Sequence, residues 1–219
     1  PSLIGIYSFD KSDDAEYWKD IYSAVQEDDV ARMEKVKNSI SAQHCATIIY
    51  TSGTTGTPKG VMLSHRNIVS NVINGKTSFP FSDAPTSRSL SFLPLNHIFE
   101  RVASYIFIYS GISIYFAQSL DSIGDDLKDV KPNVFCTVPR LLEKVYEKIM
   151  AKGAELSGVK KKLFYWAVSL GDRYDNLKSG GIGYNIQLAL ANKIIFNKWR
   201  EALGNNIDYI VTGSAACQV

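Results

Sequence analysis

Short apolar runs alternate with helical patterns along most of this chain, and this order restricts the fold more than any other feature. Runs of strand length occur at 45–50, 60–63, 89–94, 112–117, 133–138 and 207–213. Helical patterns lie beside them, at about 64–72, 97–111, 123–130, 139–153, 156–178 and 183–203. Continuous apolar strands that alternate with helices are typical of a parallel sheet covered on both faces. We therefore predict an α/β fold with a mostly parallel sheet and helices on both faces.

The first forty residues differ from the rest, because only helical patterns are found there. Apolar residues recur at three-and-four spacing in two groups, which are Trp18, Ile21, Tyr22 and Val25, and then Val30, Met33, Val36 and Ile40. This spacing predicts two amphipathic helices within 15–40. The chain also begins without an initiator Met or a signal-like apolar segment, so we expect a piece of a longer protein.

The longest uncharged run, 102–117, falls short of the roughly 20 apolar residues that span a bilayer, and Gly111 interrupts it. A buried helix followed by a buried strand is the better interpretation.

Composition excludes some partners. The net charge is +2, from 24 basic and 22 acidic residues, so no overall field favours nucleic acid. Cys45, Cys136 and Cys217 are an odd set at wide spacing, which disfavours a disulfide scaffold and a zinc site. A reducing cytoplasm is the expected location, and the sequence does not specify an oligomeric state.

One stretch, "IIYTSGTTGTPKGVMLSH" at 48–65, is rich in hydroxyls and glycine between two apolar runs. A Walker-type phosphate loop requires a hydroxyl directly after its lysine and a helix behind it. Here Lys59 is preceded by Pro58 and followed by Gly60, and the next segment reads as a strand. An ordinary P-loop is therefore disfavoured. A hydroxyl-rich hairpin that donates to phosphate oxygens fits better, although a plain polar turn is the simpler alternative.

The segment "YTSGTTGTPKG" (50–60) followed by "VMLSHRNIV" closely resembles the signature of the adenylate-forming superfamily. The segments "LSFLPLNHIFER", "VKPNVFCTVPRLLEKVYEKI", "KKKLFYWAVSLG" and "IDYIVTGSAA" resemble its long-chain fatty-acyl-CoA synthetase branch. The resemblance extends from about residue 43 onward. It implies that 43–219 is part of the large ATP- and acyl-binding N-terminal domain, that 1–42 is a helical lead-in of the same domain, and that the C-terminal domain is absent.

The resemblance implies a reaction and its co-substrates. A fatty-acid carboxylate would attack the α-phosphate of ATP, with Mg²⁺, and coenzyme A would then capture the acyl-adenylate. The loop over the β- and γ-phosphates would be formed by Thr51, Ser52, Gly53, Thr54, Thr55, Gly56 and Lys59. Hydroxyl and amide donors there would stabilise departing pyrophosphate.

The same resemblance implies roles for three further segments. His97 would lie near the acyl carboxylate and the α-phosphate as the catalytic residue, and Phe99 would line the acyl entrance. Gly213, Ser214, Ala215 and Ala216 would lie against adenine and the first acyl carbons, although many relatives have Gly-Gly-Ala-Pro there. The alternatives are a helix cap or a satisfied core residue for His97 and a plain strand-to-loop turn for 213–216. Glu100 and Arg101 would pair locally or serve the site, and the alternative for both is a solvated helix face.

Three functions remain open. The favoured one is an ATP-dependent long-chain fatty acid–CoA ligase whose nucleotide, magnesium and ribose residues and late lysine lie beyond Val219, so these residues alone should not catalyse. The second is adenylation of an aryl or amino acid, and the third is a non-catalytic nucleotide- or acyl-binding protein. The basic run 160–162 most simply forms a solvated face, with peripheral membrane contact as the alternative.

Overall fold

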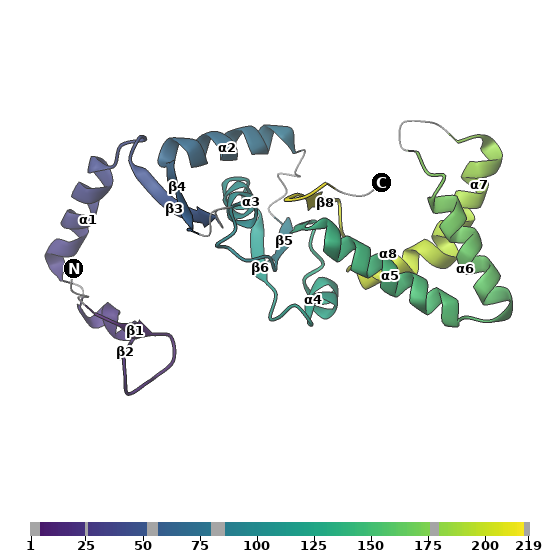
Figure 1. The fold of residues 1–219 in the computed structure, drawn as a ribbon, viewed down its shortest axis with the longest axis horizontal. Coiled ribbons are helices and arrows are strands. Elements are labelled where there is room, and N and C mark those ends of the chain that lie inside the picture. The colour runs from purple at the N-terminus through teal and green to yellow at the C-terminus, as the bar shows by residue number, and fades with distance from the viewer. Residues whose placement is uncertain (1–4, 25, 52–56, 80–85, 176–179, 217–219) are drawn as a thin grey trace.

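A computed structural model describes residues 5–24, 26–51, 57–79, 86–175 and 180–216 of the chain (Figure 1). The strands are β1 (Tyr7–Ser8), β2 (Glu16–Tyr17), β3 (Cys45–Thr51), β4 (Lys59–Ser64), β5 (Arg88–Ser91), β6 (Ser113–Phe116), β7 (Val134–Thr137) and β8 (Tyr209–Thr212). The α-helices are α1 (Glu27–Ser39), α2 (His65–Ser78), α3 (Ile98–Tyr109), α4 (Ile123–Val130), α5 (Pro139–Glu155), α6 (Gly158–Gly171), α7 (Ile182–Ala191) and α8 (Asn197–Ala202). A 3-10 helix, η1 (Trp18–Ala24), and a π-helix, η2 (Asn192–Phe196), complete the described elements.

A four-stranded sheet in the order β6-β5-β7-β8 forms the centre of the molecule, and every pair in it is parallel. Helix α3 packs on one face, and α4 covers the other together with residues around the end of α8 (Figure 1). The predicted α/β class, with a parallel sheet and helices on both faces, is confirmed.

Successive side chains of β5 and β7 point to opposite faces of the sheet, and this decides which of them pack against α3 and which against α4. Leu90 and Phe135 are paired in register and face α4, whereas Val134 and Cys136 face α3. Successive side chains of a strand point to opposite faces, so a strand covered on both sides must be apolar or satisfied throughout. Burial raises the pKa of the Cys136 thiol to about 12, so this thiol is a neutral core group.

The strands β3 and β4 form a separate antiparallel hairpin, as the sequence predicted for the two runs that flank the loop. Ser64 is the N-cap of α2: its Oγ accepts a hydrogen bond from the Asn67 amide at 3.2 Å, and the Asn67 side chain accepts from the Ser64 amide at 2.9 Å. This reciprocal cap confirms the predicted helix start. The helix continues to Ser78, further than the predicted end at about 72.

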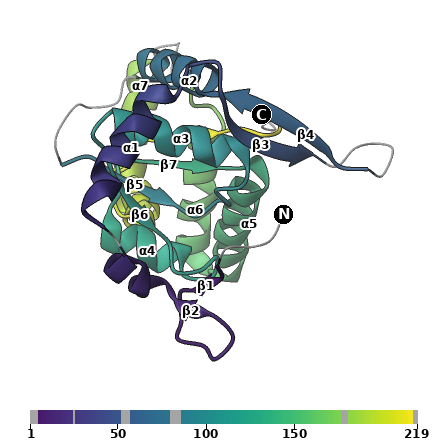
Figure 2. The ribbon, with the colours of Figure 1, turned by 90° about the vertical axis from the view of Figure 1, so that its left-hand side faces the viewer.

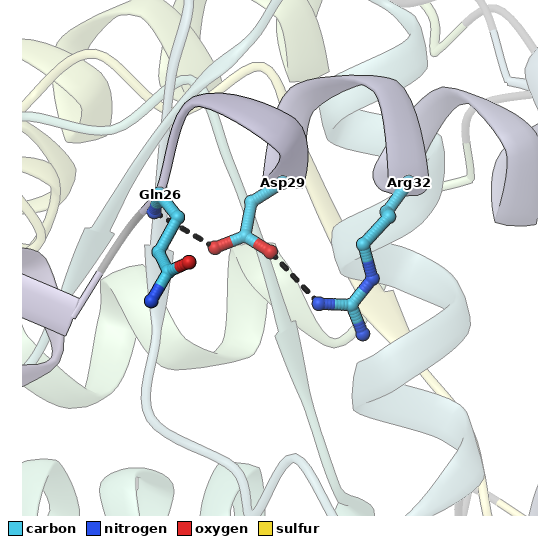
Figure 3. Close-up of polar contacts among 3 residues, drawn as sticks. All are labelled: Gln26, Asp29 and Arg32. Atoms are coloured by element: carbon cyan, nitrogen blue, oxygen red, sulfur yellow. Dashed lines mark hydrogen bonds and ion pairs between the residues drawn. The ribbon is translucent and has the colours of Figure 1, made fainter.

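The N-terminal region contains one of the two predicted helices. Residues 16–24 form β2 and η1 instead of an α-helix, and β2 pairs in parallel with β1, which fixes 16 and 17 in an extended conformation. In α1, the Gln26 amide donates to Asp29 Oδ2 at 2.9 Å, and Asp29 Oδ1 pairs with Arg32 at 3.0 Å (Figure 3). The first of these bonds satisfies the backbone amide of the N-cap residue Gln26.

The helices after β7 form a layer of their own beside the sheet (Figure 1). Ala167 and Leu170 of α6 pack against Ala191 of α7, and the Tyr184 hydroxyl donates to the Leu170 carbonyl at 2.9 Å. The predicted helix over 183–203 is present, but η2 interrupts it with one π-helical turn. The predicted 156–178 helix ends earlier, at Gly171.

No helix in the described residues is both long enough and apolar enough to cross a bilayer. The uncharged run 102–117 is, as predicted, a helix followed by a strand, with Gly111 between them at φ +73°. The predicted burial of the strand is wrong, because β6 lies at the edge of the sheet and most of its residues are exposed. Lys161, from the basic run, donates to the Ala154 carbonyl at 2.9 Å and so satisfies a carbonyl in the last turn of α5.

Candidate active site

The candidate site lies at the carboxyl ends of the parallel strands. The segment after β5 leads to His97, and the segment after β8 begins with Gly213. Because all four strands are parallel, these ends meet at one edge of the sheet, where ligands bind in open α/β folds. Two of the three predicted site segments are therefore placed at the same edge by topology alone.

His97 is the N-cap of α3, and its geometry fixes which ring nitrogen is available. The Nδ1 atom accepts a hydrogen bond from the Phe99 amide at 3.3 Å. In a neutral imidazole the proton then resides on Nε2, which is free to donate. The side chain is exposed. The cap that the sequence offered as an alternative is present, and it is compatible with a donor role.

Phe99 and Gly213 are in direct contact across the site. A Cβ atom built at Gly213 would lie 2.6 Å from Phe99 Cε2, closer than any real side chain could approach. The absence of a side chain at 213 therefore lets the aromatic ring lie against the backbone that follows β8. These two predicted site residues are brought together from positions far apart in the sequence.

The remaining residues of the 213–216 segment follow the end of β8. Ser214 adopts φ +69°, in the left-handed region that glycine occupies without strain. Ser214, Ala215 and Ala216 are exposed. The backbone here keeps a glycine-like conformation although the residue is serine.

Glu100 follows Phe99 and is almost completely buried, at 1% exposure. Its Oε1 accepts a hydrogen bond from the Ser91 hydroxyl at 2.6 Å, which ties the first turn of α3 to the end of β5. Its Oε2 is buried and has no partner among the described residues. Burial raises the pKa of Glu100, and the bond from Ser91 offsets only part of this rise. The carboxyl is therefore held toward its neutral form.

This raised pKa predicts how stability depends on pH. The unfolded chain releases the Glu100 proton near the ordinary value of 4.5, whereas the folded protein keeps it to higher pH. Between those two values the folded state binds more protons, so the free energy of unfolding falls as pH rises. We expect Glu100→Gln, which keeps an acceptor for Ser91, to remove this fall.

Urea unfolding of both proteins between pH 4.5 and 8 measures the effect. Glu147→Gln, on the exposed face of α5, is the matched control and should retain the wild-type dependence. Parallel curves for wild type and Glu100→Gln would show that Glu100 does not titrate in this way.

Arg101 points the other way, toward the hairpin. Its Nε donates to the Leu95 carbonyl at 3.1 Å, and its Nη1 donates to the Thr47 hydroxyl on β3 at 2.7 Å. The sequence left open whether Glu100 and Arg101 serve the site or lie on a solvated face. Both are bonded to other elements, so the solvated-face interpretation is wrong for these two residues.

The loop at the tip of the hairpin is described only at its ends. Thr51 and Lys59 are paired across β3 and β4, and the Thr51 hydroxyl donates to the Lys59 carbonyl at 3.4 Å. The predicted phosphate-binding residues Ser52, Gly53, Thr54, Thr55 and Gly56 lie outside the described residues. In the described part of the chain, no hydrogen bond joins Thr51 or Lys59 to His97, Phe99 or Gly213. The structure therefore brings together the His97 and Gly213 segments, and of the predicted loop it places only Thr51 and Lys59, on the neighbouring hairpin.

Sequence reasoning missed Thr47 and Ser91, the two partners that connect α3 to its surroundings. The only signal for Ser91 is a pair of serines in an otherwise apolar strand, "SLSF". No sequence pattern singles out Thr47, because a threonine is common in any strand.

The profile of the AMP-binding enzyme family matches residues 4–218. The chain therefore belongs to the AMP-binding enzymes, and the predicted membership of the adenylate-forming superfamily is confirmed.

Curated relatives specify the branch. The chain is 39% identical to long-chain acyl-CoA synthetase 3 of Arabidopsis thaliana over 174 residues, which cover 77% of this chain and 26% of the relative. It is also 39% identical to long-chain-fatty-acid–CoA ligase 5 of Rattus norvegicus over 173 residues, covering 78% of this chain and 24% of the relative. The chain thus spans about a quarter of the length of these curated relatives.

Solved structures support the fold. The adenylation domain of a carboxylate reductase from Mycobacterium chelonae matches with a TM-score of 0.53 at 24% identity, over 80% of this chain and 24% of that one. The N-terminal domain of FACL13 from Mycobacterium tuberculosis matches with a TM-score of 0.50 at 15% identity, over 82% of this chain and 33% of that one. The sheet and its covering helices are thus an arrangement shared with adenylation domains.

Proposed function

We propose that these residues form the ATP- and acyl-binding part of a long-chain fatty acid–CoA ligase, an enzyme of about the length of the curated relatives. The observation that carries the proposal is the packing of Phe99 on Gly213 at the sheet edge where His97 presents its ring. The identity to long-chain acyl-CoA synthetases over most of the chain supports the choice of acid.

The proposed chemistry has two steps. A fatty-acid carboxylate oxygen attacks the α-phosphorus of ATP, and the bond to pyrophosphate breaks. The thiol of coenzyme A then attacks the acyl carbonyl carbon of the adenylate, the bond from that carbon to the phosphate oxygen breaks, and AMP leaves. Both steps place negative charge on phosphate oxygens, which positioned hydrogen-bond donors stabilise.

Each predicted site segment has a place in this proposal. The loop from Thr51 to Lys59 would donate to the β- and γ-phosphates, with Lys59 as a fixed positive charge. The His97 Nε2–H would donate to charge that develops between the α-phosphate and the carboxylate. Phe99 and the 213–216 backbone would form an apolar wall against adenine and the first acyl carbons.

Magnesium would arrive with ATP. The described residues include no group of three or more His, Cys, Asp or Glu side chains that could hold a metal ion. We therefore assign Mg²⁺ no ligand and no step within them. Peripheral contact with a membrane, which would suit an acid that partitions into lipid, is not part of the proposal, because Lys161 is engaged at the end of α5.

Exchange of labelled pyrophosphate into ATP by the full-length protein tests the proposal. We expect exchange to depend on long-chain fatty acids, and thioester to form when coenzyme A is added. A panel of aryl and amino acids separates the second function, which predicts exchange with those acids and no thioester. Binding of ATP or acyl chains with no exchange for any acid would support the third function and overturn the proposal.

A further inference from the structure

Arg101 joins two parts of the candidate site that are far apart in the sequence. Its guanidinium bonds Thr47, 54 positions earlier, on the hairpin whose tip carries the 51–59 loop. The same guanidinium bonds the carbonyl of Leu95, two residues before His97. Figures 1 and 2 both show β3 and β4 beside α3. One side chain therefore contacts both the hairpin and the segment that presents the imidazole.

The two bonds are made at positions that control geometry. Thr47 lies at the irregular start of β3, where the register with β4 shifts, and four residues before Thr51. Leu95 belongs to the turn before α3, in which the His97 amide donates to the Pro94 carbonyl at 3.0 Å. A change in either bond would alter the angle between the hairpin and the turn, without removing any group that donates to phosphate.

We infer that Arg101 is a positioning residue, which fixes the β3–β4 hairpin, described as far as Thr51 and Lys59, at a set distance and angle from His97. This inference rests on the proposed function, because that reaction requires a defined distance between the hairpin and His97. In the proposed function, the loop would hold the β- and γ-phosphates and His97 would face the α-phosphate. The attacking carboxylate and the leaving pyrophosphate would then be in line only if the hairpin and the His97 segment keep their relative position.

Arginine suits this role better than lysine. The Nε and Nη1 donors of Arg101 serve two acceptors on two elements, and the planar guanidinium keeps the angle between those donors fixed. A lysine carries one flexible ammonium and cannot reproduce that angle. Misplacement of about 1 Å in a catalytic arrangement can cost about 100-fold in rate.

The experiment compares three variants of the full-length protein in fatty-acid-dependent pyrophosphate exchange. Arg101→Lys keeps the positive charge but loses the two separate donors of the guanidinium. Thr47→Val keeps the shape of the side chain but loses the hydroxyl. We expect each to lower kcat about 10- to 100-fold. The double variant should lose little more than Arg101→Lys alone, because both changes break the same link.

Arg88→Lys is the matched control. Arg88 also donates to a backbone carbonyl, that of Val130 at 2.9 Å, but it lies at the amino end of β5, away from the site. We expect the control to keep kcat within about twofold of wild type. Thermal stability should fall to a similar extent in both lysine variants, because each loses hydrogen bonds that a guanidinium makes to a neighbouring element. If Arg88→Lys and Arg101→Lys reduce kcat equally, Arg101 has only a structural role.

A second readout does not depend on activity. Hydrogen exchange of the β3 and β4 amides should become faster in Arg101→Lys and in Thr47→Val, with no further increase in the double variant, while β5 and β7 remain protected. If wild type shows no exchange of pyrophosphate, the proposed function fails and this readout alone decides whether the link holds the hairpin. Additive effects, or a severe loss in Arg101→Lys with none in Thr47→Val, would overturn the inference.

Discussion

Replacement of His97 by alanine is expected to lower kcat for adenylation by about 100- to 1,000-fold, the usual cost of removing one positioned donor from a charge-stabilising site. The reason is the Nε2–H, which the bond from the Phe99 amide to Nδ1 leaves free to donate. Pyrophosphate exchange at saturating ATP and fatty acid, in the full-length protein, measures this loss.

The same substitution removes a helix cap, so the two effects must be separated. His97→Ser restores an N-cap acceptor without the reach of the imidazole, and we expect it to recover stability but not activity. Ser64→Ala removes the cap of α2 and serves as the control, with a loss of about 1 kcal/mol in unfolding free energy. Equal activity losses for His97→Ala and Ser64→Ala would assign His97 to capping alone.

Replacement of Leu90 by alanine is expected to lower the free energy of unfolding by about 2–5 kcal/mol. Leu90 is 1% exposed and packs with Leu127 and Phe135 between the sheet and α4. Its removal loses the burial of the side chain and leaves a cavity that rigid neighbours on the sheet cannot fill. Urea unfolding that shows a lower midpoint at an unchanged slope measures the loss.

Leu120→Ala is the control for this prediction. Leu120 is 73% exposed, so the same change should alter stability by no more than about 0.5 kcal/mol. A similar midpoint for both variants would mean that the layer between α4 and the sheet is not a close-packed core.

The sequence predicted the central architecture because each of its elements is decided locally. The strands β6, β7 and β8 consist mostly of apolar residues, and the neighbouring helices have local start and stop signals, such as Pro139 in the first turn of α5 and Pro132 after α4. The N-terminal region was harder to predict. Trp18, Ile21 and Tyr22 have helical spacing, but Glu16 and Tyr17 pair with β1 and the residues that follow form a 3-10 helix. Pairing between strands is not encoded in the spacing of apolar residues.

By itself, the sequence determined the class of fold and the β3–β4 hairpin, and it supplied the candidates for the site, because these depend on residue type and on order along the chain. Only the tertiary structure decided how those residues meet. It placed Phe99 on Gly213, buried Glu100 against Ser91 and directed Arg101 to Thr47. The longest of these contacts, between Phe99 and Gly213, joins residues more than a hundred positions apart. Such contacts depend on the order of strands in the sheet and on the packing of α3, which no local pattern specifies.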